Sequence, residues 1–254
     1  MDNKVTKQRV INHLEYDWYK YLIFVIVGII IIVFTFQQIN RNKEDEDFTI
    51  FFTAYSMREN SFMRDIKGEF ESESYDSATY GPNIFREMTI EPQSPSSSTY
   101  SELYSTHGEV LSDVLIVHKS YFEHQDDDGN LTYNSVFRFL QLNDDILRLL
   151  GIEDKTTSEY EFMCVDSSGK RVDVTAQDAR IYGIRIDNLS NIDSIAQLKM
   201  EKDDGEIITD EYYLYLSRDK ANIGEYNPKN KKPENKQTFY CVRRFLEKYG
   251  PVQQ

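Results

Sequence analysis

The sequence predicts a single N-terminal transmembrane helix followed by one α/β (or α+β) domain. The domain is expected to hold a mixed sheet with β-hairpins and a C-terminal amphipathic helix. Three observations predict this architecture. A charge-free apolar run occupies residues 21–36, strand-like and helix-like segments alternate over residues 48–125, and residues 239–249 have the apolar spacing of a helix with one buried face. Strands alternating with helices are typical of a sheet covered by helices.

The apolar run YLIFVIVGIIIIVFTF begins at Tyr21 and is interrupted only by Gly28 and Thr35. In hydrocarbon, every backbone polar group must be satisfied within the segment, so the run predicts a membrane helix. Sixteen residues rise by about 24 Å, slightly less than the ~30 Å hydrocarbon core, so flanking residues are expected to extend the span. The residues expected at the membrane interface are Trp18, Tyr19, Lys20 and Tyr21.

The residues around the span indicate an uncleaved anchor. Gln37 to Asn40 follow the run directly, with no small-residue cleavage site and no cysteine for lipidation, as a signal peptide would require. Four basic residues precede the span, whereas only Arg41 and Lys43 follow it closely. The positive-inside rule then favours a cytoplasmic N-terminus and an exported C-terminal domain in the cell membrane. The predicted organisation is a cytoplasmic segment at 1–17, a transmembrane helix at 18–38, a charged linker at 39–47 and an extracytoplasmic globular domain at 48–254.

The chain is strongly acidic, with 29 basic and 43 acidic residues and a net charge of −14. The first 36 residues hold four basic and three acidic side chains, so the remainder carries −15. Such a surface repels phosphate backbones, and nucleic acid is therefore not an expected partner. The lipid bilayer is the partner that the span itself predicts. An aromatic content of 13% predicts a folded core after the span.

The first half of the domain predicts strands separated by helices. Residues 48–55, FTIFFTAY, combine aromatic and β-branched side chains and predict a buried strand. Ser56 and Glu59 have the spacing of a capping box, which predicts a helix over residues 56–70. A second strand is expected at residues 84–90.

The strongest strand signal follows a second predicted helix at residues 100–111. Residues 113–117, DVLIV, form a nearly continuous apolar run bounded by polar residues. Such a run is typical of a strand covered on both faces. Residues 135–152 begin with a strand-like pattern and end with a helical one.

The second half of the domain predicts two hairpins. The first spans residues 160–174, and the second joins residues 195–200 to residues 207–216 through an Asp-Gly pair, which favours a two-residue turn. Residues 181–186 predict a further strand between them. An amphipathic helix over residues 239–249 closes the domain before Gly-Pro.

Motifs for catalysis or metal binding are weak. The sequence has no GxSxG elbow, no GxGxxG turn and no phosphate loop, so no enzymatic activity and no cofactor are expected. The segment HQDDDGN resembles part of an EF-hand loop, but its first and last ligands fail, which favours a solvated turn over a metal site. Cys164 and Cys241 permit a disulfide, although two buried free thiols are the favoured interpretation.

Several segments together resemble a known family. The N-terminal span, TIFFTAYS, YSELYSTHGEVLSDVLIVHKSYF and the terminal helix resemble extracytoplasmic solute-binding proteins of the type 2 fold. In particular they resemble the shortened, membrane-anchored relatives found in Gram-positive bacteria. The resemblance covers residues 48–125 and 237–249. It implies a non-enzymatic, solute-binding-like exported domain, an accessory component of a transport system, with permease subunits or other envelope proteins as partners.

Candidate ligand residues follow from a general rule for α/β sheets, whose ligands bind beyond the carboxyl ends of the strands. Two predicted strands end at adjacent polar or aromatic positions, which makes these positions candidates for a ligand-binding edge. The candidates are Tyr55, Ser56, His118, Lys119 and Ser120. Ordinary strand-to-helix turns remain an alternative explanation. At the level of function, the alternative is a cell-envelope protein-interaction or sensor ectodomain without a small-molecule ligand.

Overall fold

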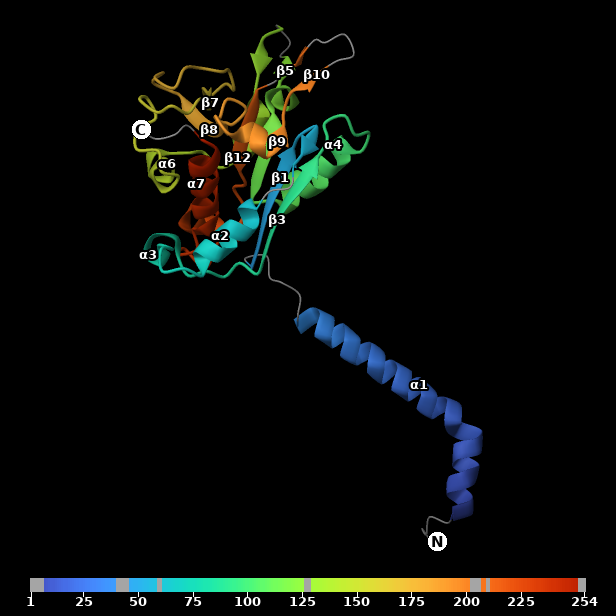
Figure 1. Ribbon diagram of the computed structural model, residues 1–254. Coiled ribbons are helices and arrows are strands. Elements are labelled where there is room, and N and C mark those ends of the chain that lie inside the picture. Colours follow the sequence, from blue (N-terminus) through green and yellow to red (C-terminus); the bar gives the residue numbers. More distant parts are fainter. Residues whose placement is uncertain are drawn as a thin grey trace. The chain divides into compact units, whose positions relative to one another are not determined.

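The computed structural model describes residues 7–39, 46–58, 61–125, 129–201, 207–208 and 211–250. The chain forms two compact units, Met1–Lys43 and Glu44–Gln254. The first unit holds the long helix α1, and the second holds the sheet domain (Figure 1).

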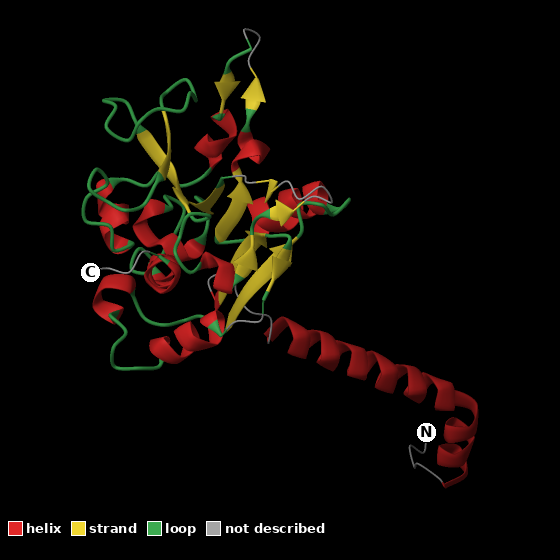
Figure 2. Cartoon of the chain, turned by 45° about the horizontal axis from the view of Figure 1, so that its top comes forward, coloured by secondary structure: helices red, strands yellow, loops and turns green. Residues whose placement is uncertain are grey.

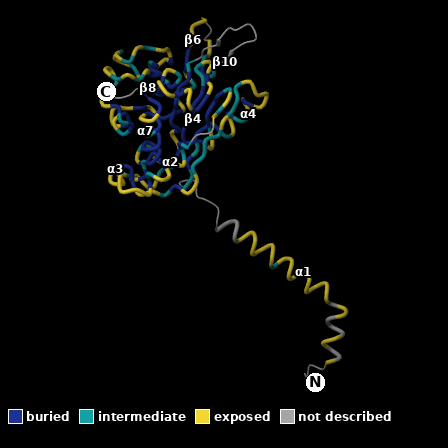
Figure 3. The backbone as a smooth tube through the Cα atoms, in the orientation of Figure 1, coloured by how far each residue is buried: buried dark blue, intermediate teal, exposed yellow. Residues whose placement is uncertain are grey.

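Helix α1 (Lys7–Ile39) carries the apolar run of the sequence. Its window Trp18–Thr35 is long and apolar enough to cross a membrane, and none of that window is buried (Figure 3). Apolar side chains exposed all around a helix suit a lipid environment better than water. The four predicted interface residues are exposed on α1, and the ammonium of Lys20 lies 5.8 Å from the ring centroid of Tyr19.

The second unit is built on one six-stranded mixed sheet, in the order β3-β1-β4-β12-β8-β7. Its strands are β1 (Asp47–Thr53), β3 (Glu87–Gln93), β4 (Val114–His118), β7 (Phe162–Val165), β8 (Arg180–Arg185) and β12 (Tyr212–Leu216). Strands β3, β1 and β4 are parallel to one another, whereas β12 is antiparallel to both β4 and β8. The predicted mixed-sheet domain is therefore confirmed.

Helices cover both faces of this sheet (Figures 1 and 2). One face packs against helices that include α2 (Phe62–Phe70), α6 (Asp144–Leu149) and α7 (Gln237–Tyr249). The other face packs against the helical segment α4 (Tyr100–Leu103), η2 (Tyr104–Gly108) and α5 (Glu109–Leu111), and against η3 (Lys119–Phe122) and η4 (Asn134–Arg138). The C-terminal amphipathic helix α7 matches its prediction.

Side-chain alternation explains why the central strands read as continuous apolar runs. In β4, Val114 and Ile116 face the α7 side, whereas Leu115 and Val117 face the α4 side. Strand β12 alternates in the same way: its even-numbered residues join the α7-side core and Tyr213 and Tyr215 join the other. Because both faces are buried, neither strand needs a polar side.

The helix predicted over residues 56–70 begins later than its capping-box pattern suggested. Ser56–Met57 form the short strand β2, which pairs with β9 (Ala196–Gln197). The Ser56 hydroxyl donates to Gln197 Oε1 at 3.1 Å, so pairing with β9 takes the place of a helix start. Helix α2 begins at Phe62, with Ser61 at its N-cap position. Similarly, the strand-like start of residues 135–152 is the 3-10 helix η4.

The first predicted hairpin forms only beside its turn. Strand β7 pairs with β8, and only the isolated bridge between Val165 and Arg171 remains of the expected partner strand. The turn at residues 166–169 does form, because Asp166 Oδ1 accepts the N–H groups of Ser168 and Lys170. A local turn therefore does not guarantee that the chain continues as a paired strand.

The second predicted hairpin is only partly present. Strands β10 (Met200–Glu201) and β11 (Ile207–Ile208) pair antiparallel, whereas β12 enters the main sheet between β4 and β8. Its Asp-Gly turn lies outside the described residues. Burying the five residues of β12 on two faces outweighs extending a short two-stranded ladder.

The remaining described elements are short. They are α3 (Ser77–Tyr80), β5 (His124–Gln125), β6 (Leu131–Thr132), η5 (Ile192–Ser194) and η6 (Ala221–Tyr226). Cys164 in β7 and Cys241 in α7 are both free and buried.

Candidate functional site

The order of the parallel strands identifies one edge of the sheet as a candidate binding edge. The chain runs from β1 outward to β3 and then returns past β1 to β4, so its direction across the sheet reverses between β1 and β4. At such a topological switch point the two connections leave on opposite faces, and a crevice can form beyond the carboxyl ends of the strands. We call this the β1/β4 edge, and it comprises residues 53–56 and 118–121.

The structure places all five predicted ligand residues along this edge. Phe52 of β1 pairs with Ile116 of β4, the last pair between these two strands, so both strands end at the same edge of the sheet. Tyr55 is half-buried and its N–H donates to the Gln197 carbonyl oxygen at 3.0 Å. Ser56 is exposed.

His118 lies within a group of tyrosine rings. Its ring is roughly parallel to that of Tyr100, with the centroids 6.3 Å apart, and meets the rings of Tyr121 and Tyr212 more nearly edge-on at 5.9 and 6.0 Å. His118 Nδ1 lies 2.5 Å from the hydroxyl oxygen of Ser120. The imidazole is thus held at the strand end by rings on three elements and by one hydroxyl.

Tyr100, whose ring lies against that of His118, also belongs to a buried hydroxyl pair. Thr53 Oγ1 and the Tyr100 hydroxyl lie 2.7 Å apart, and both residues are buried. Burial raises the pKa of Tyr100, so its phenol is neutral. The pair fixes the end of β1 against α4, on the sheet face that Tyr100 covers.

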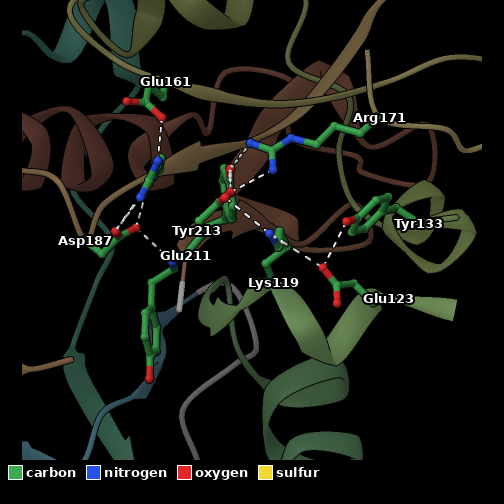
Figure 4. A network of polar contacts seen from close by, with 10 residues as sticks. Lys119, Glu123, Tyr133, Glu161, Arg171, Asp187, Glu211 and Tyr213 are labelled. Atoms are coloured by element: carbon green, nitrogen blue, oxygen red, sulfur yellow. Dashed lines mark hydrogen bonds and ion pairs between the residues drawn. The ribbon is translucent and has the colours of Figure 1, made fainter. Parts of the chain in front are cut away.

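Beside His118, the side chain of Lys119 enters a charged network on the α4 side of the sheet (Figure 4). Lys119 Nζ lies 3.2 Å from Glu211 Oε1 and 3.6 Å from Glu123 Oε1. Arg171 pairs with the other oxygen of Glu211 at 2.8 Å. Two cations and two carboxylates thus meet where β4 ends and β12 begins.

Two tyrosine hydroxyls complete the network. Tyr213 donates to Glu211 Oε2 at 2.6 Å and accepts from Arg171 at 2.8 Å, while Tyr133 donates to Glu123 at 3.0 Å. Burial, with the neighbouring Glu211, holds the pKa of Tyr213 well above its usual value. Burial and the hydrogen bond to Glu123 raise the pKa of Tyr133 to about 12.

The pKa of the Glu211 carboxyl is lowered, whereas the pKa values of Tyr213 and Tyr133 are raised. Partial burial raises it, but the hydrogen bonds from Tyr213 and Lys119 and the charge of Arg171 outweigh that effect and lower the pKa. The carboxylate is therefore ionised at neutral pH. The whole network is close to electrically neutral, because its two cations offset its two carboxylates.

A second charged cluster braces the neighbouring strand ends. Asp187, just after β8, accepts the backbone N–H of Tyr212 at 2.8 Å. Arg185 donates to the same carboxylate at 3.0 and 2.9 Å and to Glu161 at 2.7 Å. These contacts hold β12 against β8 and fix the position of Tyr212, which pairs with His118 across the sheet.

The described residues contain no group of three or more His, Cys, Asp or Glu side chains placed to hold a metal ion. The acidic turn at residues 124–130 lies partly outside the described residues. Its described part begins as β5, whose His124 pairs with Thr132.

Sequence reasoning identified the β1 and β4 ends but missed the residues that come from β12 and from the segments just before β12 and after β7 and β8. These residues are Arg171, Asp187, Glu211, Tyr212 and Tyr213. The one available signal is the pattern Glu-Tyr-Tyr at 211–213, which begins an apolar strand with a carboxylate. This pattern gains its meaning only when β12 pairs with β4, about a hundred residues earlier in the chain. No local sequence pattern indicates such a pairing.

Over the described residues, the features define an α/β protein with one helix of membrane-spanning length and a mixed sheet. The β1/β4 edge of that sheet carries tyrosines, a histidine and a balanced charge network. No protein-family model, no curated protein and no solved structure matches the chain.

Proposed function

We propose that this protein is a non-enzymatic, single-pass membrane protein whose exported domain binds a small polar solute at the β1/β4 edge, as an accessory component of a transport system. The observation that carries the proposal is the coincidence of two independent features. The topological switch point falls between β1 and β4, and the same edge gathers His118, its tyrosine neighbours and the Lys119 network.

The charges at this edge favour a particular ligand class. Lys119 and Arg171 already pair with Glu211, and Lys119 also lies near Glu123. A ligand with a large net charge would have to break these pairs, at the cost of leaving a partly buried charge uncompensated. Neutral or zwitterionic solutes, such as sugars, amino acids and short peptides, can instead bond to the hydroxyls and pack against the tyrosine rings.

Thermal unfolding of the purified full-length chain in detergent, measured against a panel of sugars, amino acids and short peptides, tests the binding step. A ligand at a hundred times its dissociation constant stabilises the native state by about 2.7 kcal/mol. For a domain of this size we expect a rise in melting temperature of about 5 °C or more. A flat response across the panel would contradict the proposal.

A matched pair of histidine variants tests the location. His118→Ala should abolish the ligand-induced shift. His107→Ala serves as its control, because His107 is also half-exposed and bonded to one neighbour, Glu91 at 3.2 Å, but lies in η2 rather than at the β1/β4 edge. Equal loss of the shift in both variants would place the ligand elsewhere.

Cysteine labelling tests the exported orientation of the domain. The two native cysteines are buried, so they should contribute little to the labelling. Single cysteines at Ser98, in an exposed loop of the domain, and at Lys7, at the start of α1, are treated with a membrane-impermeant maleimide on intact cells. Labelling at Ser98→Cys but not at Lys7→Cys is expected. The reverse pattern would place the domain in the cytoplasm.

A further inference from the structure

The end of the sheet opposite the β1/β4 edge carries a basic segment in an otherwise acidic domain. Residues 217–236 contain six basic and three acidic side chains, although the chain beyond residue 36 has a net charge of −15. Four of the basic side chains are exposed: Arg218, Lys229, Lys231 and Lys232. One of the three acids, Glu225, is paired internally with Lys236 at 2.7 Å.

Backbone and side-chain contacts fix where this segment lies. The N–H of Ser217 donates to the carbonyl oxygen of Asp113, directly before β4, at 2.9 Å. The side chain of Asn222 approaches the carbonyl oxygen of Asp47, the first residue of β1, at 3.5 Å. The basic segment therefore covers the amino ends of β1 and β4.

An apolar pair lies beside it. Val110 and Leu111 are 62% and 54% exposed, which is unusual for large apolar side chains of this domain. Lys220, within the basic segment, donates to the Val110 carbonyl oxygen at 2.9 Å. A hollow of about 380 Å³ lies between the two features and is lined in part by Val110, Arg218 and Lys220.

The covalent chain limits how far this end can be from the end of helix α1. Helix α1 ends at Ile39 and β1 begins at Asp47. Even a fully extended chain joins these two residues over no more than about 28 Å. If α1 spans the membrane, the amino end of β1 stays within that reach of the helix terminus, and Asn222 of the basic segment lies beside that end.

We propose that residues 217–236, with Val110 and Leu111, form a surface that docks the domain on the anionic phospholipids of the membrane in which the chain is anchored. Exposed lysines attract anionic headgroups, and exposed apolar side chains enter the headgroup boundary. Docking by this end directs the β1/β4 edge away from the lipid, where solutes are free to reach it. The inference rests on the membrane anchor of the proposed function but not on solute binding.

The test uses the full-length chain in liposomes of phosphatidylcholine alone or with phosphatidylglycerol, followed by hydrogen–deuterium exchange. Slower exchange of residues 217–236 and 109–111 is expected only with phosphatidylglycerol, and the protection should weaken at 1 M salt. One lysine near an anionic surface contributes a factor of about five, so the variant Lys229→Glu/Lys231→Glu/Lys232→Glu should reduce the docked fraction relative to the undocked one by about a hundredfold or more.

A charge-matched control separates docking from net charge. The variant Lys67→Glu/Lys170→Glu/Lys199→Glu changes three exposed lysines outside the segment by the same amount and should keep the protection. Equal exchange in the two lipids, protection that survives reversal of Lys229, Lys231 and Lys232, or protection that depends on protein density and not on lipid charge would each overturn the proposal. The last result would indicate contact with a second copy. Loss of the chain from the liposomes in a carbonate wash would instead contradict the anchor.

Discussion

Lys119 and Glu211 are joined twice, although 92 positions separate them in the sequence. The backbone N–H of Lys119 donates to the Glu211 carbonyl oxygen at 2.7 Å, and the Lys119 ammonium donates to Glu211 Oε1 at 3.2 Å. The pair therefore ties the end of β4 to the start of β12 through one main-chain and one side-chain hydrogen bond. It also determines the position of Tyr212 and hence the surroundings of His118.

Replacing the Glu211 carboxylate should destabilise the sheet domain. Glu211→Gln removes the carboxylate that Arg171 and Lys119 share and leaves Lys119 with Glu123 at 3.6 Å, while both cations remain partly buried. Hydrogen bonds to charged groups contribute about 1.5–3 kcal/mol each. We expect the free energy of unfolding to fall by about 2 kcal/mol. Urea titration followed by near-UV circular dichroism of the tyrosines measures it, because the single tryptophan lies in α1. Glu153→Gln, at an exposed position, is the control and should change stability little.

The same carboxylates predict a loss of stability in acid. The pKa of Glu69 is lowered mainly by hydrogen bonds from Arg244, against the opposing effect of burial, and the pKa of Glu211 is lowered as described above. Because both pKa values lie below the unfolded value near 4.5, the unfolded chain takes up protons first as the pH falls. Stability from these two groups is therefore fully present above about pH 5 and is lost as the pH drops through the folded pKa values.

Unfolding titrations between pH 3 and pH 7 test this dependence. The double variant Glu69→Gln/Glu211→Gln should be less stable at pH 7 and should show a shallower decline in acid than the wild type. Parallel curves for the two proteins would show that other groups control the acid transition.

Two glycines predict changes of opposite sign. A Cβ on Gly183 in β8 would lie 2.9 Å from the ring of Tyr215, which is fully buried against Phe122 and Phe139 and cannot move away. Gly183→Ala should therefore cost about 1–3 kcal/mol. Gly68 lies within α2 with nothing within 4 Å of its Cβ position, so Gly68→Ala should stabilise by about 0.5–1 kcal/mol. Melting temperatures that shift in the same direction for both variants would contradict this account of the β8–β12 packing.

The central strands and their pairings differ in how far the sequence determines them. The run at residues 113–117 predicted a strand buried on both faces because all of its residues after Asp113 are apolar, whichever face they meet. The same property in β12 did not reveal its partners, since Leu214 pairs with Ile116 and Ile184, both distant in sequence. The Asp-Gly pair before β12 favoured a local hairpin, but the free energy of burying β12 in the main sheet is larger.

The candidate site was predictable to the extent that it depends on strand ends. Tyr55 and His118 could be assigned to the same edge because parallel strands end at one edge of a sheet. The charge network around Lys119 could not, because Glu211 and Arg171 come from segments beside other strands, and single charged residues are too common on surfaces to be distinguished by pattern. Non-local pairing therefore limits site prediction here more than residue chemistry does.

The two cysteines should be unreactive while the domain is folded. Burial, together with the nearby Asp173, raises the pKa of Cys164 to about 11, and complete burial raises that of Cys241 well above its usual value. Because only the thiolate attacks, at pH 8 about one Cys164 in a thousand is in the reactive form. Labelling by an aromatic disulfide reagent at pH 8 should proceed only at the rate at which the domain opens, and both thiols should react within seconds in 6 M urea. Rapid labelling of Cys241 in the native protein would show that α7, which carries it against the sheet, is not stably packed.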